Sequence, residues 1–415
     1  MAHHTTSRRH FLQLAAGAST LPWAASCASA GPSEALTADT PGSREVRAIG
    51  QPMPAGVQLP ETPPQPKSED SVGFAIIGLG DYALRQMMPR FIRSRRAHIA
   101  AVVSGNDEKA DTVGTAYGVP EDARYSYDSF DAIAEDDRVE AVYIVLPTGL
   151  HAEWAEKAFA AGKHVLCEKP MAMDAAECQR MIDASERAGR KLMIAYRCHF
   201  EPYNLRAMEL MREDAVGDIR LIRTDQHYNA GPATPATNWR LSRALGGRGP
   251  LEDYGIYGVQ SALYLSGEMP ELIGARAFQP AGDPRFSEIA AYVGTMMQFP
   301  SGAVAQLSTS YDAAGSNRAL VRGVGGTLTM DPATNYDGNR LSLRVGRSSE
   351  SFEPGDCTVQ FAAQLDHLAD AIRDGTAIKT PGEMGLRDVR LMTAIYTAAA
   401  ETRLIAMNPD GTMKD

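Results

Sequence analysis

Cysteine is scarce in this sequence, which has five among its 415 residues. Four of them lie beyond the N-terminal leader, namely Cys167, Cys178, Cys198 and Cys357. Their spacing lacks the close pairs that hold zinc, and their density is far below that of a disulfide-stapled domain. We therefore expect neither a metal site nor a disulfide framework, and we predict buried free thiols.

An excess of positive charge and long apolar runs are also lacking. The formal net charge is −10 at pH 7, whereas a nucleic-acid-binding face needs clustered Lys and Arg. Beyond the leader, no stretch approaches the roughly 20 apolar residues that span a bilayer. These two absences argue against nucleic-acid partners and against a membrane anchor in the mature chain.

The first 30 residues have the pattern of an export signal. Ser-Arg-Arg at 7–9 precedes a short apolar run, and the small-residue site Ala-Ser-Ala follows at 28–30. Twin arginines direct proteins that fold before export. Cys27 could instead mark a lipoprotein site, but Ala24 stands where such sites favour Leu. We predict a twin-arginine signal peptide over residues 1–30 and a periplasmic location.

Residues 31–70 are rich in Pro, Gly, Ser and Thr and include Pro60, Pro63, Pro64 and Pro66. Such a composition cannot bury a core of its own and is typical of an extended arm. The remaining length suffices for two domains. We predict a proline-rich arm at 31–70, a nucleotide-binding domain at 71–193, and a second, substrate-binding domain at 194–415.

The first of these domains alternates apolar strands with helical segments. Strand-like runs occur at 73–77, 98–103, 140–146, 164–167 and 191–195, and helical patterns occur at 84–94, 107–117 and 151–162. This alternation predicts a parallel sheet with helices on both faces. The first strand leads into Gly78 and Gly80, the first two glycines of the dinucleotide fingerprint, with Ala83 as an allowed third. We expect a Rossmann domain with Leu79, Asp81 and Tyr82 beside the cofactor.

The end of the second strand bears on the choice of nucleotide. An NAD-binding domain usually has an acidic residue there, about twenty residues after the glycines. Ser104, Gly105, Asn106 and Lys109 stand in this region instead. A hydroxyl, an amide and a cation suit a ribose 2′-phosphate, so NADP is favoured over NAD. Asp107 as the acidic residue is the alternative.

The ends of two later strands contain further residues that could contact the cofactor or the substrate. Leu146 and Pro147 follow one strand, and His151 either contacts the cofactor or packs at the start of the next helix. Glu168, Lys169 and Pro170 follow another strand. A lysine at the carboxyl end of a parallel strand faces the ligand crevice. Pro170 restricts Lys169 to extended geometry, and a cis bond would project it sideways.

The second domain has a different pattern. A helix at 202–213 precedes strand-like runs at 218–228, 272–279, 289–299, 302–310, 318–323, 326–330 and 340–345. Short spacing and turns between them predict a mostly antiparallel open sheet. Two amphipathic helices, around 361–372 and 389–396, close the chain. The fold class is therefore α/β plus α+β.

A long loop at 229–251 and the helix after it contain the remaining candidates. Loops of this length usually bind ligand, and this one contains Trp239 and Arg240. Asp253 and Tyr257 are four residues apart and share one helical face. A tyrosine acts as a base when a cation stabilises its phenolate, and Lys169 is the obvious cation. Core packing is the alternative role for this tyrosine.

Several motifs resemble one known family, the glucose–fructose oxidoreductase/inositol dehydrogenase family, and within it the exported glucose–fructose and aldose–aldose oxidoreductase branch. They are Gly-Leu-Gly-Asp-Tyr-Ala-Leu at 78–84, Ser-Gly-Asn at 104–106, His-Ala-Glu at 151–153, Ala-Gly-Lys-His-Val at 161–165, Cys-Glu-Lys-Pro-Met at 167–171, Tyr-Arg-Cys-His at 196–199, Trp-Arg-Leu at 239–241, Gly-Ile-Tyr-Gly at 255–258 and Gln-Leu-Asp-His-Leu at 364–368. The matches run from about residue 71 to residue 400.

This resemblance implies an activity and a set of residue roles. Tyr257 would be the acid–base residue, Lys169 would orient substrate and tune it, and Asp253 would support it. Glu168, Lys169 and Arg197 would also contact the cofactor, and Trp239 and Arg240 the substrate. Relatives in the exported branch keep NADP bound while they oxidise an aldose to its lactone and reduce a second sugar to an alditol.

The resemblance also implies a homo-oligomer, either dimer or tetramer, formed through the open sheet face. The arm at 31–70 would shield the cofactor or embrace a neighbouring subunit. Three other functions stay open: glucose–fructose oxidoreductase proper, an aldose dehydrogenase that releases its cofactor, and a non-catalytic sugar-binding protein. Retention of Lys169, Asp253 and Tyr257 together argues against the last of these.

Overall fold

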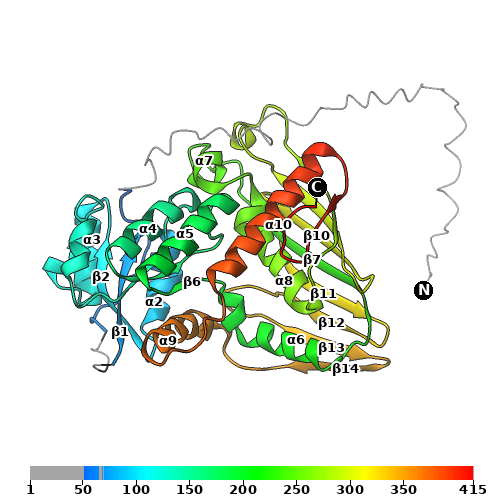
Figure 1. Cartoon of the computed structure of the whole chain (residues 1–415), viewed down its shortest axis with the longest axis horizontal. Helices are drawn as coiled ribbons and strands as arrows, with labels where there is room; N and C mark the ends of the chain where they lie inside the picture. The colour runs from blue at the N-terminus through cyan, green and yellow to red at the C-terminus, as the bar shows by residue number, and fades with distance from the viewer. Residues whose placement is uncertain (1–50, 65–67, 69, 415) are drawn as a thin grey trace, which may run out of the picture.

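Two sheets organise the chain, one parallel and one mostly antiparallel (Figure 1). The computed structural model describes residues 51–64, 68 and 70–414. The predicted signal peptide at 1–30 and the first part of the arm, 31–50, lie outside these residues. One large cluster of buried apolar side chains extends through both halves of the described chain, and a second, small cluster contains Leu241, Phe286 and Tyr311.

The first sheet has six parallel strands in the order β3-β2-β1-β4-β5-β6. Its strands are β1 (Val72–Ile77), β2 (Ala97–Val103), β3 (Arg124–Tyr125), β4 (Ala141–Ile144), β5 (His164–Cys167) and β6 (Leu192–Ile194). Every residue of β1 and β4 is buried. Strands that are apolar on both sides need helices over both faces, and this is why the sheet is parallel and doubly covered. The predicted Rossmann fold is confirmed.

Helices connect these strands. They are the π-helical turn η1 (Ala83–Met87) with α2 (Met88–Phe91), α3 (Asp107–Tyr117), α4 (His151–Ala160) and α5 (Ala175–Ala188). The helix predicted at 84–94 therefore contains a π-helical turn and ends earlier. Helix α5 was not predicted, although Asp174 caps its start and Gly189 ends it in a left-handed conformation.

The second sheet has nine strands in the order β14-β13-β12-β11-β7-β10-β9-β8-β15. They are β7 (Ile219–Asn229), β8 (Leu272–Phe278), β9 (Tyr292–Gln298), β10 (Val304–Ser310), β11 (Asp312–Gly323), β12 (Gly326–Met330), β13 (Leu341–Val345), β14 (Ser348–Phe352) and β15 (Ile405–Ala406). Only the β7–β10 pair is parallel. The predicted mostly antiparallel sheet is confirmed, while β14 and β15 were not predicted and β11 begins six residues earlier than expected.

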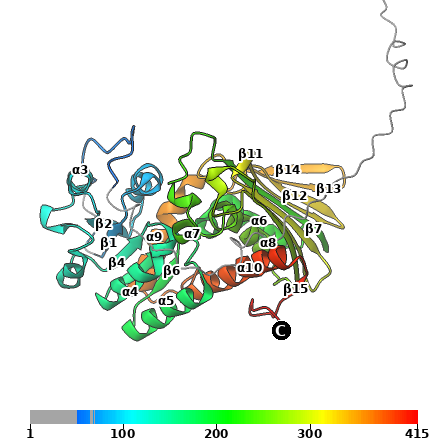
Figure 2. The same cartoon turned by 90° about the horizontal axis from the view of Figure 1, so that it is seen from above.

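Helices cover one face of this sheet, as Figure 2 shows. They are α6 (Pro202–Arg212), α8 (Ile256–Ser266) and α10 (Gly382–Glu401). The loop at 229–251 contains two short turns, η6 (Trp239–Leu241) and α7 (Arg243–Gly246), and the π-helical turn η7 (Leu251–Gly255) follows it. The loop therefore runs directly into the helix that contains Tyr257.

Helix α9 (Gln360–Arg373) returns to the parallel sheet. Asp366 accepts hydrogen bonds from the Ser94 hydroxyl and from the backbone nitrogens of Arg95 and Arg96, just before β2. Helix α10 also packs against α5 and β6, so two helices of the predicted segment 194–415 contact the nucleotide-binding half.

The four cysteines of the described chain are buried and free, as predicted. None of the helices in residues 51–64, 68 and 70–414 combines the length and apolarity needed to cross a bilayer.

Candidate active site

Two cavities meet at the carboxyl edge of the parallel sheet. The larger, here called the sheet-edge cavity, has a volume of about 480 Å³. The smaller, here called the inner cavity, has a volume of about 320 Å³ and lies against the second sheet. Six residues line both: Asp81, Lys169, Asn238, Arg240, Asp253 and Tyr336. A molecule in one cavity therefore lies next to a molecule in the other.

The glycine turn after β1 forms the floor of the sheet-edge cavity. Gly78 has φ +95°, and a Cβ there would lie 2.5 Å from the Val145 carbonyl oxygen. A Cβ on Gly80 would meet no protein atom within 4 Å, so this backbone is open toward the cavity. Leu79, Asp81 and Tyr82 line the same wall. An exposed backbone at the start of a helix suits a pyrophosphate, so these residues fit a dinucleotide.

The end of β2 forms the far wall of this cavity. Ser104 and Lys109 line it, and Lys109 is only 7% exposed. Gly105 and Asn106 are not among its lining residues. The Asn106 side chain accepts a hydrogen bond from the Lys109 backbone nitrogen at 2.8 Å and caps α3, while the Ser104 hydroxyl accepts one from the Asn106 nitrogen at 3.1 Å. Asn106 thus fixes the position of Lys109.

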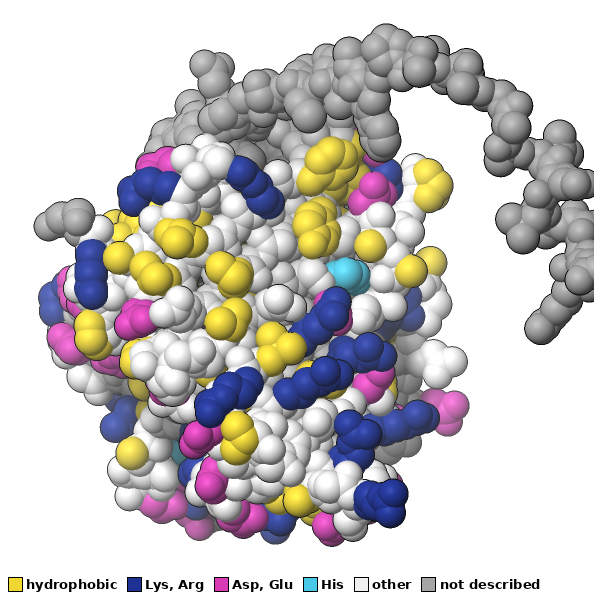
Figure 3. Space-filling view, turned by 90° about the vertical axis from the view of Figure 1, so that its right-hand side faces the viewer, with side chains coloured by type: hydrophobic (Ala, Val, Ile, Leu, Met, Phe, Trp, Pro, Cys, Tyr) yellow, Lys and Arg dark blue, Asp and Glu magenta, His cyan; other side chains and the backbone are white. Residues whose placement is uncertain are grey.

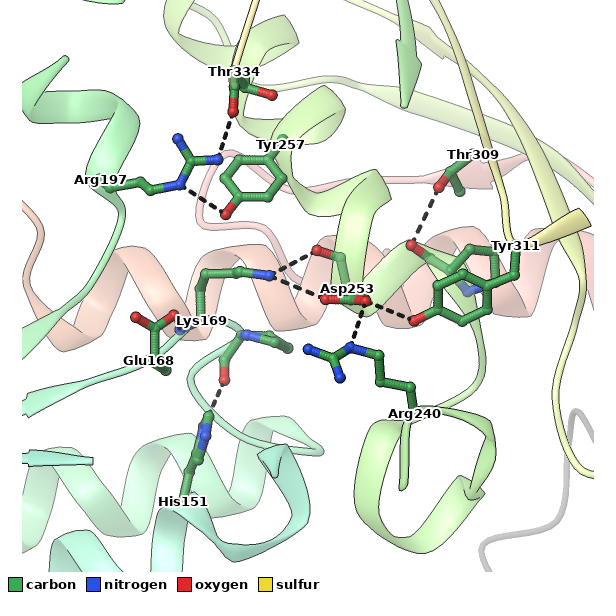
Figure 4. Close-up of polar contacts among 12 residues, drawn as sticks. His151, Glu168, Lys169, Arg197, Arg240, Asp253, Tyr257, Thr309, Tyr311 and Thr334 are labelled. Atoms are coloured by element: carbon green, nitrogen blue, oxygen red, sulfur yellow. Dashed lines mark hydrogen bonds and ion pairs between the residues drawn. The ribbon is translucent and has the colours of Figure 1, made fainter. Parts of the chain in front are cut away.

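His151 lies beneath the cavities and lines neither of them, contrary to one of its two expected roles. Its Nδ1 is 2.9 Å from the Pro170 carbonyl oxygen (Figure 4). Its Nε2 is 2.8 Å from the Leu146 carbonyl oxygen. Burial lowers the pKa of the imidazole. His151 therefore connects the loop after β4, where Leu146 and Pro147 line the sheet-edge cavity, to the segment after β5.

The segment after β5 presents Lys169 to both cavities. The Lys169–Pro170 bond is cis. Lys169 Nζ donates a hydrogen bond of 2.8 Å to the Asp253 carbonyl oxygen and lies 3.4 Å from Asp253 Oδ1. The neighbouring Glu168 accepts hydrogen bonds from the Tyr143 hydroxyl at 2.7 Å and from the Lys169 nitrogen at 3.2 Å. Burial raises the pKa of Glu168.

Asp253, in η7, receives three donors. Besides Lys169, Arg240 Nε lies 3.1 Å from Oδ2, and the Tyr311 hydroxyl donates to Oδ2 at 3.1 Å. Burial alone would raise the pKa of this carboxyl group, but Arg240 and Lys169 hold it below its ordinary value. π-Helical turns are frequently found at functional sites, and this one was not predicted. Asp253 and Tyr257 both line the inner cavity.

Tyr257 is hydrogen-bonded to a different cation from the one expected. Its hydroxyl oxygen accepts a hydrogen bond from Arg197 Nε at 3.2 Å. Lys169 Nζ lies 4.9 Å from the centroid of the Tyr257 ring. Burial raises the pKa of Tyr257, and Arg197 opposes that rise. Arg197 was expected to contact the cofactor, but it lines the inner cavity and not the sheet-edge cavity.

Trp239 also lines a different cavity from the one expected. It was expected to contact substrate, but it lines the sheet-edge cavity and not the inner one. The Arg240 guanidinium lies 4.3 Å from its ring centroid. The loop at 229–251 borders both cavities, since Thr234 lines the inner one, Thr237 the sheet-edge one and Asn238 both.

The described part of the arm also reaches the sheet-edge cavity. Gln51, Pro52 and Pro54 form part of its wall. Arg85 donates hydrogen bonds to the carbonyl oxygens of Ala55 and Gly56, which hold the arm against the helix after the glycine turn. The arm therefore narrows access to the Gly80 backbone.

Sequence reasoning missed much of the inner cavity. Its wall includes Gln226, Tyr228, Tyr311, Asn317, Thr334, Asn335 and Tyr336. These residues come from β7, from the single residue between β10 and β11, from the interior of β11, and from the connection between β12 and β13. No local pattern marks them, because only the sheet order brings them together.

The chemistry of the two cavities is complementary. The inner cavity presents hydroxyl, amide and charged groups, which suits a polyhydroxylated molecule. Among residues 51–64, 68 and 70–414 no group of three or more His, Cys, Asp or Glu side chains is placed to hold a metal ion. A tyrosine hydroxyl beside a dinucleotide cradle is an arrangement suited to hydride transfer from an alcohol carbon.

Comparison with known protein families gives two matches. Residues 72–196 match the profile described as "Oxidoreductase family, NAD-binding Rossmann fold", and residues 204–329 match the "GFO/IDH/MocA C-terminal domain". The two matched regions correspond to the parallel sheet and to most of the antiparallel sheet.

Comparison with individual proteins gives similar results. An aldose-aldose oxidoreductase from Caulobacter crescentus, solved in complex with glycerol, is 42% identical over 81% of this chain and 100% of its own, with a TM-score of 0.78. A D-xylose 1-dehydrogenase (NADP(+)) from Haloferax volcanii is 29% identical over 79% of this chain and 97% of its own. A 3-ketoreductase from Actinomadura kijaniata, in complex with NADP and TDP-benzene, is 25% identical over 79% and 98%, with a TM-score of 0.70.

Proposed function

Because the chain belongs to the GFO/IDH/MocA oxidoreductase family, we propose that it is an exported enzyme with tightly bound NADP that oxidises an aldose to its aldonolactone and reduces a second sugar to an alditol. The observation that carries this proposal is the junction of the two cavities, where Lys169 and Asp253 belong to both walls. The similarity to the Caulobacter aldose-aldose oxidoreductase supports it.

The sheet-edge cavity fits NADP. Gly78 and Gly80 would hold the pyrophosphate, and Ser104 and Lys109 would hold the 2′-phosphate. A buried ammonium at Lys109 favours an anion there, whereas an acidic residue would repel it. When bound, the nicotinamide supplies the hydride acceptor and donor.

The inner cavity would hold the sugar. Lys169 and Asp253 orient the reacting hydroxyl, and Tyr257 takes its proton as the carbon loses hydride and the C=O bond forms. For the second sugar Tyr257 returns this proton to the new hydroxyl. Because one pocket serves both steps, the lactone leaves before the second sugar enters, and the kinetics are ping-pong.

Tight retention of the cofactor is supported by the arm. Gln51, Pro52 and Pro54 stand in the wall of the sheet-edge cavity. The twin-arginine pattern at 7–9 gives a reason for retention, since a nucleotide lost in the periplasm could not be replaced. The xylose dehydrogenase relative favours a second candidate, an aldose dehydrogenase that releases its cofactor.

We also propose that two copies associate through the outer face of the nine-stranded sheet. Figure 3 shows this face, with hydrophobic and basic side chains interspersed. Phe278, Tyr292 and Met296 are exposed there, at 58%, 37% and 46%. Light scattering of the Phe278→Glu, Met296→Glu double variant should give a smaller mass than the unchanged protein. An unchanged mass would contradict this interface.

The reaction is tested by recording the absorbance of the purified protein before and after one aldose is added, without free nucleotide. We expect a stoichiometric rise in reduced nicotinamide, which a second sugar reverses. Denaturation should release NADP, and double-reciprocal plots for donor and acceptor should be parallel. Converging lines with dependence on added NADP would place the protein with the cofactor-releasing dehydrogenases.

A further inference from the structure

Arg197 is a buried cation whose hydrogen-bond partners are all neutral. Its side chain donates to the Thr334 and Asn335 carbonyl oxygens, to Gln360 Oε1 at 2.6 Å and to the Tyr257 hydroxyl oxygen. The residue is only 4% exposed. A buried charge is costly unless an anion or a dense set of dipoles compensates it. Within the described chain, Arg197 has dipoles and no carboxylate partner.

Lys169 is in the opposite situation. Its ammonium is committed to Asp253, whose carbonyl oxygen and carboxylate it contacts at 2.8 and 3.4 Å. It lies beneath the face of the Tyr257 ring and forms no hydrogen bond with its hydroxyl group in the described structure. Figure 4 shows the two cations on different sides of Tyr257. The positive charge of Lys169 is therefore partly neutralised by Asp253.

From this contrast we infer that Arg197, and not Lys169, is the positioning residue that stabilises the Tyr257 phenolate during sugar oxidation. The inference rests on the proposed role of Tyr257 as proton acceptor. The guanidinium aims Nε at the hydroxyl oxygen at 3.2 Å and stacks 4.7 Å from the ring centroid, so it both orients the tyrosine and meets the charge that develops on it.

A second aromatic ring holds Arg197 in place. Its guanidinium carbon lies 4.5 Å from the centroid of the Tyr336 ring, and Tyr336 lines both cavities. Gln360, at the start of α9, accepts a hydrogen bond from a terminal nitrogen of the Arg197 guanidinium group and so fixes the end of that group farther from Nε. Because α9 is anchored to the parallel sheet, the nucleotide-binding half determines where this charge lies relative to Tyr257.

Other titratable groups also surround Tyr257. They are Cys198 from the same turn as Arg197, Glu168 and Lys169 after β5, Asp253 in η7, Tyr82 after the glycine turn and Tyr336 between β12 and β13. The carboxylates disfavour a phenolate, and the neutral hydroxyl and thiol groups do not compensate it. Unlike each of these groups, Arg197 combines a full positive charge with a hydrogen bond to the Tyr257 oxygen.

The inference predicts an asymmetry between the two half-reactions. Oxidation needs Tyr257 as phenolate, and reduction needs it as phenol. An opposite charge at this distance lowers the pKa of an acid by on the order of 1–3 units, so loss of Arg197 raises the pKa of Tyr257. At a pH below the pKa of Tyr257, each unit by which this pKa rises reduces the phenolate population about tenfold. Arg197→Gln should therefore slow oxidation about ten- to a thousandfold and leave reduction within about threefold.

Stopped-flow measurement of the two half-reactions, over a range of pH with the nucleotide-loaded protein, tests this. In Arg197→Gln the rate of nicotinamide reduction by an aldose should be lower along the whole rising limb of its pH profile. Lys169→Gln should slow both half-reactions without that asymmetry. Arg90→Gln is a matched control, because it removes a guanidinium that stacks on Phe361 and touches no acid–base group.

A double variant separates the positioning role of Arg197 from the proposed acid–base role of Tyr257. If Arg197 acts through Tyr257, Arg197→Gln should cause no further loss in the Tyr257→Phe background. Equal slowing of both half-reactions by Arg197→Gln, additive loss in the double variant, or the asymmetry in Lys169→Gln instead would overturn the inference. Near-normal turnover of Tyr257→Phe alone would instead overturn the proposed acid–base role.

The conservative variant provides a further measurement in case Arg197→Gln does not fold. Arg197→Lys keeps the charge and loses the planar fork. The ratio of the oxidative to the reductive rate should then change by less than about threefold. A tenfold or larger change in that ratio would refute charge as the reason for the role of Arg197.

Discussion

Replacement of Asp253 by Asn should destabilise the protein strongly, because one largely buried carboxylate serves two cations. The Lys169 and Asp253 side chains are 13% and 16% exposed, and Arg240, whose side chain is 39% exposed, contacts the same carboxylate at 3.1 Å. Removal of one partner from a buried ion pair costs about 3–5 kcal/mol. Since Asp253→Asn leaves two neighbouring cations without an anion, we expect a loss in this range.

The pH dependence of this loss follows from the pKa of Asp253. Its folded value is lowered, and an unfolded Asp titrates near about 3.9. The carboxylate therefore contributes its full stabilisation above about pH 5, and this contribution is lost as the pH falls through the folded pKa. The difference in unfolding free energy between the original protein and Asp253→Asn should be constant near neutrality and shrink in acid.

Urea denaturation of the nucleotide-loaded protein, followed by circular dichroism at several pH values, measures both effects. Glu153→Gln is the matched control. Glu153 pairs with Lys157 on the surface of α4, where the side chains are 53% and 41% exposed, and such pairs contribute roughly 0–1 kcal/mol. If Asp253→Asn costs no more than this control, the electrostatic account of the cluster is wrong.

Two further predictions concern the proton acceptor and the nucleotide. Tyr257→Phe deletes a proton and almost no volume, so turnover should fall by about 10²–10⁴-fold while nucleotide stays bound; near-normal steady-state rates would show that another residue carries the proton. Ser104→Asp places a carboxylate at the end of β2 beside the cavity wall, so the nucleotide released on denaturation should change from NADP toward NAD. Unchanged NADP content after that substitution would contradict the placement of the 2′-phosphate.

Much of the fold could be predicted from local patterns. Apolar runs that are buried on both sides, such as β1, are long enough to be recognised without their neighbours. The short strands β3 and β15 contain two residues each, and their extended conformation depends on the pairing partner. Strand β11 begins at Asp312, within a polar stretch that pairs irregularly with β7. Such segments adopt an extended conformation because they pair with a neighbouring strand, and their own side chains do not specify it.

The candidate site likewise contains residues that local sequence patterns identify and contacts that only the complete fold creates. Lys169, Asp253 and Tyr257 could be named because each follows a recognisable strand end or helix start, and all three line the inner cavity. The relation between Arg197 and Tyr257 could not be predicted, since the residues are 60 positions apart and meet only after both sheets have formed. His151 was ambiguous for a related reason, because a sequence does not reveal that both ring nitrogens face backbone carbonyl oxygens.

The wall shared by the two cavities has a consequence for the evolution of this enzyme. Asn238 and Arg240 belong to one loop and touch both compartments. If the inner cavity holds the sugar and the sheet-edge cavity the nucleotide, as proposed, a change in this loop that adapts the pocket to a new sugar will also change the affinity for the nucleotide. Selection for a different substrate should therefore yield paired substitutions, one that alters sugar choice and a second that restores cofactor retention. Laboratory evolution on a poor sugar would reveal this as variants that gain activity and at the same time begin to shed their nucleotide.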